Sequence, residues 1–486
     1  MALNRLGWIL LLCGAGQASD WMRFRGPNGS GVADAKNLPQ EIGPSSNVIW
    51  KAAVPPGHSS PILVGDRIFL TAAEGGKRVD AGRDKWVDEG GRLFTYAVHR
   101  ANGEILWRQQ VPRPRMERYQ AANSPASPSA VSDGNSVFVF FGDFGLISYT
   151  LDGKERWRHP LGPFNNVNGH GSSPVVYGDN VILVCDSDTD SFLLAVDKHT
   201  GKVAWRTERP EVTRSYVTPA VYDPGDGPAQ LIVPGAYHLH GYNAVTGEKL
   251  WFLRGLSWQP KSTPVVAGGL VYAHWWEAGG EAEGPAPETP PFRELLVKFD
   301  ANKDGRIAKD ELAADARLQR GFENTDLAND GFWDEQDWEN SRARRASKNA
   351  LLALRPKGTG ELAESSIVWR MQKFLPNVPS PLVYEGVLYL VKDGGILTAV
   401  DARTGEILKQ GRLPGALDTY YASPVAADGK VYLISQQGKA TVLKAGPQWE
   451  VLHSADFEEE AYATPAIADG RIYLRTKRTL YCFGKK

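Results

Sequence analysis

The segment Ala195-Val196-Asp197-Lys198-His199-Thr200-Gly201-Lys202-Val203-Ala204-Trp205 decides the fold of this 486-residue chain. An apolar strand runs into an Asp-x-x-Thr-Gly corner, where the glycine supplies a positive φ. The chain then re-emerges as a second strand that carries tryptophan. Residues 242–251 and 399–408 repeat this pattern, and 97–107 and 149–157 are weaker copies. A pattern that returns at a regular distance indicates a repeat architecture.

Each repeat also has a first half, in which a proline after small residues leads two or three apolar residues, a Gly, Asp or Asn turn and a second apolar run. The prolines are Pro61, Pro128, Pro174, Pro219, Pro264, Pro381, Pro424 and Pro465. Successive gaps are 67, 46, 45, 45, 117, 43 and 41 residues. One unit therefore holds four short strands in about 45 residues, which is the size of one propeller blade.

Eight units predict an all-β fold, an eight-bladed β-propeller. The run Val48-Ile49-Trp50 precedes the first unit, and the last unit stops at Phe483 after its third strand. We expect 48–50 to supply the missing outer strand of the last blade, because closure removes open sheet edges. The tryptophans at the ends of the repeats are expected to pack between blades: Trp107, Trp157, Trp205, Trp251 and Trp369.

These repeats resemble those of the pyrroloquinoline-quinone-like propeller superfamily, which includes quinoprotein alcohol dehydrogenases and the outer-membrane-assembly lipoprotein propeller. Residues 20–31, Asp-Trp-Met-Arg-Phe-Arg-Gly-Pro-Asn-Gly-Ser-Gly, resemble the opening of exported bacterial members. The resemblance covers nearly the whole chain after the first 19 residues, outside one insertion. It implies a fold and leaves the activity open.

Composition excludes several classes of protein. Hydrophobic residues make up 42% and charged residues 23%, which excludes a globally disordered chain. Lys+Arg 55 against Asp+Glu 56 gives a net charge of −1, so no nucleic-acid partner is expected. Three cysteines without a C-x-x-C motif exclude a disulfide framework, a zinc cluster and covalent c-type haem.

The first 18 residues predict a signal peptide, and hence a periplasmic or extracellular protein. Arg5 gives the positive start, 8–12 the apolar stretch and 14–19 the small-residue cleavage zone. The apolar stretch is shorter than the ~20 residues of a spanning helix, and no second one follows, so no membrane span is predicted. Leu12 is bulky for a lipoprotein cleavage site, so lipidation at Cys13 stays open. We expect a monomer.

The gap between Pro264 and Pro381 is about one blade plus 70 residues, and it predicts an insertion at 278–347. The insertion begins with a sequence typical of a flexible linker, 278–287, and continues with a helix-type sequence from Pro291. It interrupts blade five between its second and third strands. The predicted propeller therefore comprises 20–277, with blades one to four and the first part of blade five, and 348–486, with the rest of blade five and blades six to eight.

The insertion contains a 12-residue segment, 300–311, that fits an EF-hand calcium loop. The predicted Ca²⁺ ligands are Asp300, Asn302, Asp304, the backbone carbonyl of Arg306, and Glu311 with two oxygens. Gly305 allows the sharp turn, and Ala308 leaves one ligand position to water. Flanking helices are expected at 292–299 and 312–322. Three carboxylates among hard oxygen ligands favour calcium.

A second, degenerate loop is predicted at 326–337. Its candidate ligands are Asp326, Asp330, Phe332 through its carbonyl, Asp334 and Asp337. Ala328 removes one ligand, and Asp337 is shorter than the usual closing glutamate, so occupancy stays open. Because the insertion leaves blade five between its second and third strands, we hypothesise that it overhangs the mouth of the central channel as a lid or docking arm.

Residues just before each repeat proline are expected to line that mouth. They are His58, Asn123, Asn168, His170, Arg214, Tyr216, Lys261, Asn377, Tyr420, Tyr421 and Tyr462. Such a set can bind a small polar, anionic or sugar-like ligand. The alternative is that these residues only solvate the channel.

The resemblance to quinoprotein dehydrogenases implies an adjacent Cys-Cys pair and a Glu-Asn-Asp set that holds Ca²⁺ beside the quinone. This chain has no such cysteine pair, and the candidate mouth positions contain no carboxylate. Pyrroloquinoline quinone is therefore a doubtful cofactor. The sequence predicts an exported, non-catalytic calcium-binding propeller, which acts as a binding or assembly scaffold for a protein partner or a small polar ligand. The alternative is a quinone-dependent dehydrogenase, or another redox enzyme, with a degenerate cofactor site.

Overall fold

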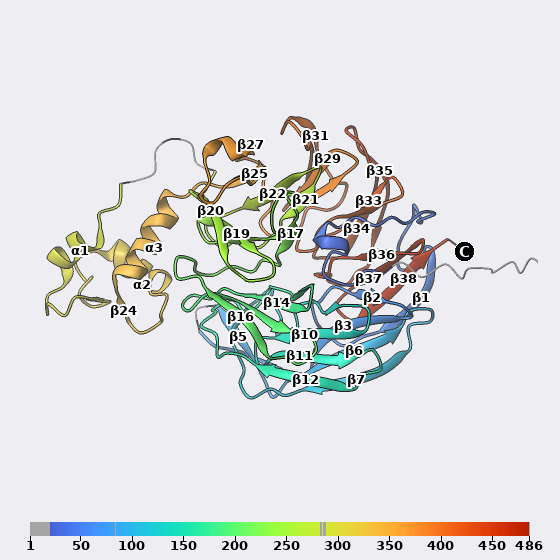
Figure 1. Ribbon diagram of the computed structural model, residues 1–486, viewed down its shortest axis with the longest axis horizontal. Coiled ribbons are helices and arrows are strands. Elements are labelled where there is room, and N and C mark those ends of the chain that lie inside the picture. The colour runs from blue at the N-terminus through green and yellow to red at the C-terminus, as the bar shows by residue number, and fades with distance from the viewer. Residues whose placement is uncertain (1–19, 83, 282–283, 285–287, 486) are drawn as a thin grey trace, which may run out of the picture.

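The computed structural model describes residues 20–82, 84–281, 284 and 288–485. The signal-peptide prediction and Cys13 lie outside the described residues. The described chain is mostly strand, with three short α-helices gathered in one region (Figure 1). Among the described residues, no helix has the length and apolar character needed to cross a membrane.

Eight antiparallel sheets of four strands make up the body of the fold, numbered here in chain order. Sheets 1 to 4 contain β2 (Ile62–Val64), β3 (Arg67–Glu74), β6 (Arg92–His99) and β7 (Ile105–Val111); β9 (Val131–Ser132), β10 (Ser136–Phe141), β11 (Gly145–Thr150) and β12 (Glu155–Pro160); β13 (Val175–Tyr177), β14 (Asn180–Cys185), β15 (Phe192–Asp197) and β16 (Val203–Glu208); and β17 (Ala220–Tyr222), β18 (Gln230–Gly235), β19 (His238–Asn243) and β20 (Lys249–Arg254). The short β26 (Gly360–Glu361) adds a parallel fifth strand to sheet 4, beside β20.

The second half of the body repeats the same order from inner to outer strand. Sheets 5 to 8 contain β21 (Val265–Ala267), β22 (Leu270–Trp275), β25 (Ala350–Leu354) and β27 (Ile367–Met371); β28 (Leu382–Tyr384), β29 (Val387–Lys392), β30 (Ile396–Asp401) and β31 (Ile407–Arg412); β32 (Val425–Ala427), β33 (Lys430–Ile434), β34 (Lys439–Lys444) and β35 (Glu450–Asp456); and β36 (Ala466–Ala468), β37 (Arg471–Arg475), β38 (Thr479–Gly484) and β1 (Val48–Ala53). The arrangement is propeller-like (Figure 1).

The outer strand of sheet 8 comes from the other end of the chain, as the sequence predicts. β1 pairs antiparallel with β38, with Val48 opposite Phe483 and Ala53 opposite Thr479. In Figure 1 the blue β1 accordingly lies beside the red β38. This pairing joins the two ends of the described chain and leaves sheet 8 with the same four strands as its neighbours.

Serine and threonine hydroxyls join the innermost strands of neighbouring sheets. At seven junctions between described sheets, a backbone N–H of one sheet donates to a hydroxyl oxygen of the next at 2.9–3.0 Å, and Thr464 returns to Ser60. At the remaining junction, β17 lies against β21. The members of this hydroxyl ring are Ser60, Ser129, Ser173, Thr218, Thr263, Ser380, Ser423 and Thr464.

The hydroxyl ring corrects the predicted register of the second repeat. Ser129 occupies the ring, and the residue after it is Ala130, so Pro128 is not the repeat proline. Pro128 lies two residues before Ala130, the residue at the repeat-proline position. Its carbonyl accepts a hydrogen bond from the Thr71 hydroxyl at 3.1 Å. The sequence Ser127-Pro128 matches the repeat pattern, but the backbone hydrogen bonds show that Ser129 is the equivalent of the other ring residues.

Tryptophans lock neighbouring sheets together farther from the centre. The Trp157 ring lies on Gly201, the corner glycine of the next sheet, so that a Cβ there would come within 2.7 Å of the ring. Its indole N–H donates to the Lys198 carbonyl at 2.9 Å. The same tryptophan–glycine contact pairs Trp50 with Gly103, Trp107 with Gly153, Trp205 with Gly247 and Trp369 with Gly405.

Trp251 packs between sheets 4 and 5, but the glycine against its ring is Gly241 of its own sheet, where a Cβ would come within 2.2 Å, and not a corner glycine of the next sheet. Its indole N–H donates to the Gln230 side chain of its own sheet at 2.7 Å. Sheet 5 has no Asp-x-x-Thr-Gly corner, because β25 and β27 are joined by a longer segment that contains β26 and the 3-10 turn Glu364–Ser366. The predicted packing role holds for Trp251, but the geometry differs.

The insertion leaves sheet 5 between β22 and β25, as predicted. It contains α1 (Phe292–Phe299), α2 (Ala316–Thr325), α3 (Glu335–Ala346) and the two-stranded sheet of β23 (Ile307–Ala308) and β24 (Phe332–Trp333). The second helix begins later than predicted, at Ala316, because the Asp315 side chain caps it by accepting from the backbone N–H groups of 317 and 318. The insertion extends sideways from the ring (Figure 1), so the hypothesis of a lid over the channel mouth is wrong.

A second insertion, absent from the prediction, accounts for the gap of 67 residues. It leaves sheet 1 between β3 and β6 and forms a three-stranded sheet, the mouth sheet, from β4 (Lys77–Asp80), β5 (Lys85–Glu89) and the later β8 (Tyr119–Gln120). The backbone N–H of Gln120 donates to the Asn168 carbonyl at 3.1 Å. The mouth sheet therefore connects sheet 1 with the loop that enters sheet 3.

The N-terminal segment 20–38 crosses the far end of the ring, opposite the mouth. Trp21 exchanges two backbone hydrogen bonds with Leu63 of sheet 1, at 3.0 Å each. Arg23 donates to the Pro219 carbonyl at 2.6 Å, and Arg25 donates to the Pro381 carbonyl at 2.7 Å. Because these contacts reach inner strands of sheets 1, 4 and 6, the segment spans the far end of the channel.

The tryptophan–glycine contact predicts a position-specific cost of a methyl group. Gly201→Ala should destabilise the protein by roughly 2–4 kcal/mol, because φ is positive there and the new Cβ meets the Trp157 ring. Gly178→Ala is the matched control: φ is also positive, but no atom lies within 4 Å of its Cβ, so about 1 kcal/mol is expected. Urea unfolding of both variants measures the difference, and equal losses would contradict the contact.

Candidate functional site

A cavity of about 440 Å³, the channel cavity, lies on the axis of the ring and is lined by all eight members of the hydroxyl ring. Each ring oxygen of the seven joined junctions accepts a backbone N–H, so its own O–H remains able to donate. The structure brings eight of the candidate mouth residues to this cavity: His58, Asn123, Asn168, Tyr216, Lys261, Asn377, Tyr421 and Tyr462.

Three candidate residues lie elsewhere. The His170 Nε2 atom lies 2.9 Å from Glu117 Oε2, and the ring stands edge-on to Phe140 and Phe164. Arg214 pairs with Asp188 and lines a separate cavity of about 460 Å³. Tyr420 is fully buried in the hydrophobic cluster between sheets 6 and 7.

Four buried cations that lack acidic partners in the described part of the chain lie at the inner strands or at the loops that enter them. Lys261 donates to the Asn377 side-chain oxygen at 3.0 Å, while Arg23, Arg25 and Arg475 donate to backbone carbonyls. Burial lowers the pKa of Lys261 to about 8, of Arg25 and Arg475 to about 9 and of Arg23 to about 10. No carboxylate among the described residues forms an ion pair with these four groups, and of the four only Lys261 lines the channel cavity.

One carboxylate in the channel wall, Glu277, was not predicted from the sequence. Glu277 follows β22 directly and lines the channel cavity. It accepts from Arg344 of α3, with Nε at 3.1 Å and Nη2 closer. The guanidinium of Arg344 also lies 4.1 Å from the Trp258 ring centre. This ion pair connects the insertion to the ring. In the sequence, the only sign of Glu277 was its position next to the start of the predicted insertion.

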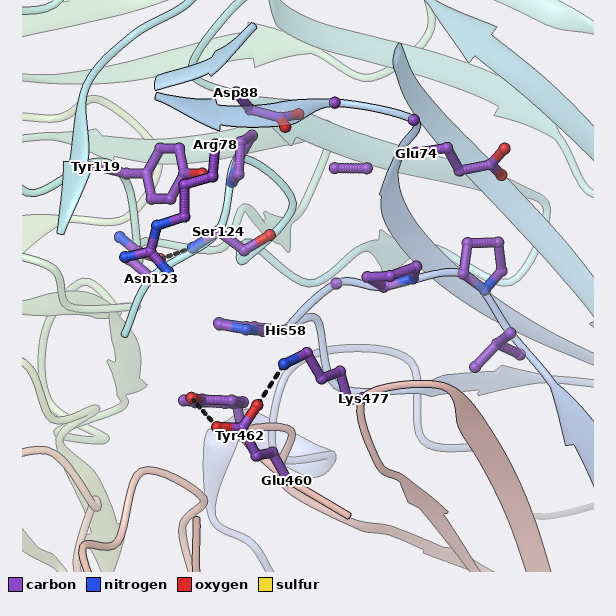
Figure 2. Close-up of a pocket in the computed structure, with 18 of the residues that line it drawn as sticks. His58, Glu74, Arg78, Asp88, Tyr119, Asn123, Ser124, Glu460, Tyr462 and Lys477 are labelled. Atoms are coloured by element: carbon purple, nitrogen blue, oxygen red, sulfur yellow. Dashed lines mark hydrogen bonds and ion pairs between the residues drawn. The ribbon is translucent and has the colours of Figure 1, made fainter. Parts of the chain in front are cut away.

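A larger cavity of about 1460 Å³, the mouth groove, opens beside the channel under the mouth sheet. Figure 2 shows part of its wall. The His58 ring stacks on Tyr462, with ring centres 3.9 Å apart and planes at 10°, and Tyr421 lies 5.3 Å from Tyr462. Burial, with help from the charges of Arg475 and Lys477, lowers the pKa of His58 to about 3. The imidazole is therefore neutral at physiological pH.

The opposite wall of the mouth groove carries charged residues that the sequence did not indicate. Arg78 of β4 lies over the Trp86 ring, 4.3 Å from its centre, and 6.0 Å from that of Tyr119. Asp88 of β5 is paired with Arg113 at 3.0 Å. Arg78, Trp86 and Asp88 belong to the insertion in sheet 1, which lacks the repeat pattern, and Arg113 and Tyr119 follow β7. In the sequence, only the unusual length of the gap between Pro61 and Pro128 indicated that an insertion is present.

The acidic loops of the insertion share one backbone pattern. In the first loop, 300–311, Asp300 Oδ2 accepts from the Gly305 N–H at 3.0 Å. In the second loop, 326–337, Asp326 Oδ2 accepts from the Gly331 N–H at 3.1 Å. Ile307 and Trp333 pair across β23 and β24, so the loops lie side by side.

The closing residues of both loops also point toward backbone amides. Glu311 accepts from the Ala301 N–H at 3.0 Å and the Ala308 N–H at 2.8 Å. Asp337 accepts from the Leu327 N–H at 2.8 Å, and burial raises its pKa to about 7. No three acidic, histidine or cysteine side chains among the described residues converge to hold a metal. The loop path and the oxygen donors suit a hard cation, but the carboxylates are turned to the backbone.

The residues present do not fit the quinone site of the dehydrogenases. Cys185 and Cys482 are both buried, in sheets 3 and 8, and burial raises the pKa of each thiol. The carboxylate in the channel wall, Glu277, is engaged by Arg344. The described channel therefore offers neither the cysteine pair nor the Glu-Asn-Asp set.

Comparisons with known proteins agree with this architecture. The sequence profile of the PQQ-like repeat family, described as outer membrane protein assembly factor BamB, matches residues 89–275 and 296–485. The outer membrane protein assembly factor BamB of Burkholderia pseudomallei (strain K96243) is 25% identical over 232 residues, which are 46% of this chain and 51% of that protein. The chain thus spans about half the length of this curated relative.

Two solved structures illustrate the likeness in fold. The quinohemoprotein alcohol dehydrogenase of Comamonas testosteroni has a TM-score of 0.57 at 11% identity, over 96% of this chain and 81% of that one. BamB of Moraxella catarrhalis has a TM-score of 0.49 at 13% identity, over 86% and 98%. At such identities the first likeness shows the fold alone.

Lys261 should destabilise the protein in a pH-dependent way. Burial lowers its pKa in the folded protein to about 8 from the ordinary lysine value of 10.5, so the penalty is complete below pH 8 and fades as pH rises toward 10.5. We expect Lys261→Met to raise the free energy of unfolding at pH 7 by up to about 3 kcal/mol, and by much less at pH 10.5. Chemical denaturation at both pH values measures this, and a gain independent of pH would contradict the assignment.

Proposed function

Since the chain belongs to the PQQ-like repeat family described as outer membrane protein assembly factor BamB, we propose that its eight sheets are propeller blades of an exported binding or assembly scaffold. The family match over both halves of the ring carries this proposal. The predicted signal peptide at 1–18 supports export to the periplasm or beyond, and the name of the relatives suggests a role at the outer membrane.

The mouth face is the proposed docking surface for a protein partner. The segment 20–38 spans the far end of the channel, so features that could recognise a partner lie at the other end. There the mouth groove, the mouth sheet and the docked part of the insertion share one side of the ring. Inner hydroxyls and outer tryptophans hold the eight sheets rigidly, which keeps the ordering cost of binding low.

The insertion is proposed to be a pair of EF-hands whose first loop binds Ca²⁺. Asp300, Asn302, Asp304, the Arg306 carbonyl and Glu311 would hold the ion, and the glycine-anchored path of the loop supports this. The second loop, with Asp326, Asp330, Phe332, Asp334 and Asp337, would act mainly as its structural partner. Calcium would pull the carboxylates away from backbone amides and rigidify the insertion.

Calcium titration tests the loop proposal. We expect isothermal titration calorimetry of the whole protein to show Ca²⁺ binding that Glu311→Gln weakens at least 100-fold, because the bidentate carboxylate closes the site. Asp310→Asn is the matched control, since this neighbour is exposed and occupies a position that supplies no ligand. Absence of Ca²⁺ binding by the unaltered protein, or equal losses in both variants, would refute the site.

Site-specific crosslinking tests the scaffold proposal. A photoreactive residue in place of Gln437, on the exposed turn between β33 and β34, should yield adducts with an identified outer-membrane protein or assembly factor. The same residue in place of Asp179, on the exposed turn between β13 and β14 at the far face, should not. Mass spectrometry of the adducts decides. Identical adducts at both positions, or none at the mouth, would count against a docking surface there.

A further inference from the structure

The mouth groove is elongated, and its size suits an oligomeric ligand of several monomer units. It runs from Tyr462 at the channel, past Gly75 and Gly76, to Trp107 and Arg108 on the outer strand of sheet 1. Its volume of about 1460 Å³ exceeds the ~300–1,000 Å³ of pockets for single small molecules. Small residues keep its floor open, so a linear oligomer can lie along it.

Aromatic planes stand at the inner end of the groove. The stacked pair His58–Tyr462 forms one wall, and Tyr119 belongs to the mouth sheet across the cavity (Figure 2). A neutral imidazole backed by a phenol ring presents a flat face with hydrogen-bonding edges. Pyranose rings carry C–H faces bordered by hydroxyls, so they complement such planes.

Most charges of the groove are already neutralised within the protein. Glu460 is paired with Lys477, and Asp88 is paired with Arg113. The neutral polar side chains of the lining are Gln120, Asn123, Ser124 and Gln436. Amides and hydroxyls between aromatic planes match a ligand rich in hydroxyl groups better than one rich in charges.

Arg78 is the exception. Its guanidinium lies over Trp86, and Arg78 and Asn123 both line the groove (Figure 2). Among the described residues no carboxylate is paired with it. A guanidinium held over an indole ring is positioned for a two-pronged contact with a carboxylate or sulfate.

We propose that the mouth groove binds an acidic oligosaccharide, with its sugar rings against His58–Tyr462 and one acidic group on Arg78. This goes beyond the scaffold function, which needs no glycan, and the two stand on different observations. The mouth sheet supplies Arg78 and Tyr119. The repeat architecture does not need the insertion in sheet 1, and ligand binding would give this insertion a role.

Calorimetry with defined probes tests this proposal on the full chain after the signal peptide. The acidic probes are trigalacturonate and a sulfated trisaccharide, the neutral probe is maltotriose, and the peptide probe is tetraglutamate. We expect at least one acidic sugar to bind, with maltotriose at least tenfold weaker and tetraglutamate without measurable binding. Saturation-transfer NMR should show contact from protein aromatic protons to the sugar C–H groups.

Variants separate the two recognition elements. Arg78→Gln should weaken the acidic sugar at least tenfold, to the level of maltotriose, and Tyr462→Ala should weaken both sugars. Arg92→Gln is the matched control: this arginine also lies over a ring, that of Phe94 at 5.6 Å in the same sheet, but it does not line the groove. Its affinity should stay unchanged, and thermal unfolding checks that all variants are folded.

Three results would overturn the proposal. They are failure of both acidic sugars to bind, binding of tetraglutamate as tight as that of the sugars, and undiminished binding by Arg78→Gln. The second result would assign the groove to an acidic peptide. The crosslinking experiment reports on the protein partner independently, so failure of the glycan site and failure of the scaffold function are distinguishable.

Discussion

The ring of serine and threonine hydroxyls is the interaction on which the rest of the structure depends. Innermost strands of neighbouring sheets belong to separate sheets and share no ladder, so their N–H groups at the junctions need another acceptor. At seven of the eight junctions a hydroxyl at the same place in the next sheet supplies it, and the Thr464 N–H closes back on Ser60. A buried N–H without a partner costs ~1–3 kcal/mol, so the ring constrains every sheet at once.

The outer contacts complete what the hydroxyl ring begins. A corner glycine leaves room for a tryptophan from the preceding sheet, as Gly201 does for Trp157. The two layers of contacts fix the angle between sheets, and β1 carries the closure to sheet 8. This redundancy lets the channel tolerate unpaired cations such as Lys261, which oppose folding. Groups that destabilise a rigid frame are typical of functional sites.

Both insertions leave their sheets between the second and third strands, and they serve the same face in different ways. The mouth sheet stays close to the ring and forms a wall of the groove with Arg78 and Tyr119. The insertion in sheet 5 extends outward and touches the ring mainly through 323–344, where Arg344 meets Glu277 and Trp258. One face thus combines the mouth groove with the base of a protruding arm.

The sequence by itself determined the features that repeat or depend on short spacing. Periodicity predicted the repeated units and the strand that closes sheet 8, and the long gap placed the insertion between β22 and β25. Local oxygen spacing singled out both acidic loops. Only the tertiary structure decided which candidates face the channel. His170, Arg214 and Tyr420 turn away because loops from other sheets supply Glu117, Asp188 and an apolar cluster as better partners. The direction of the insertion, the mouth sheet and Glu277 likewise depend on contacts between residues far apart in the chain, which no local pattern encodes.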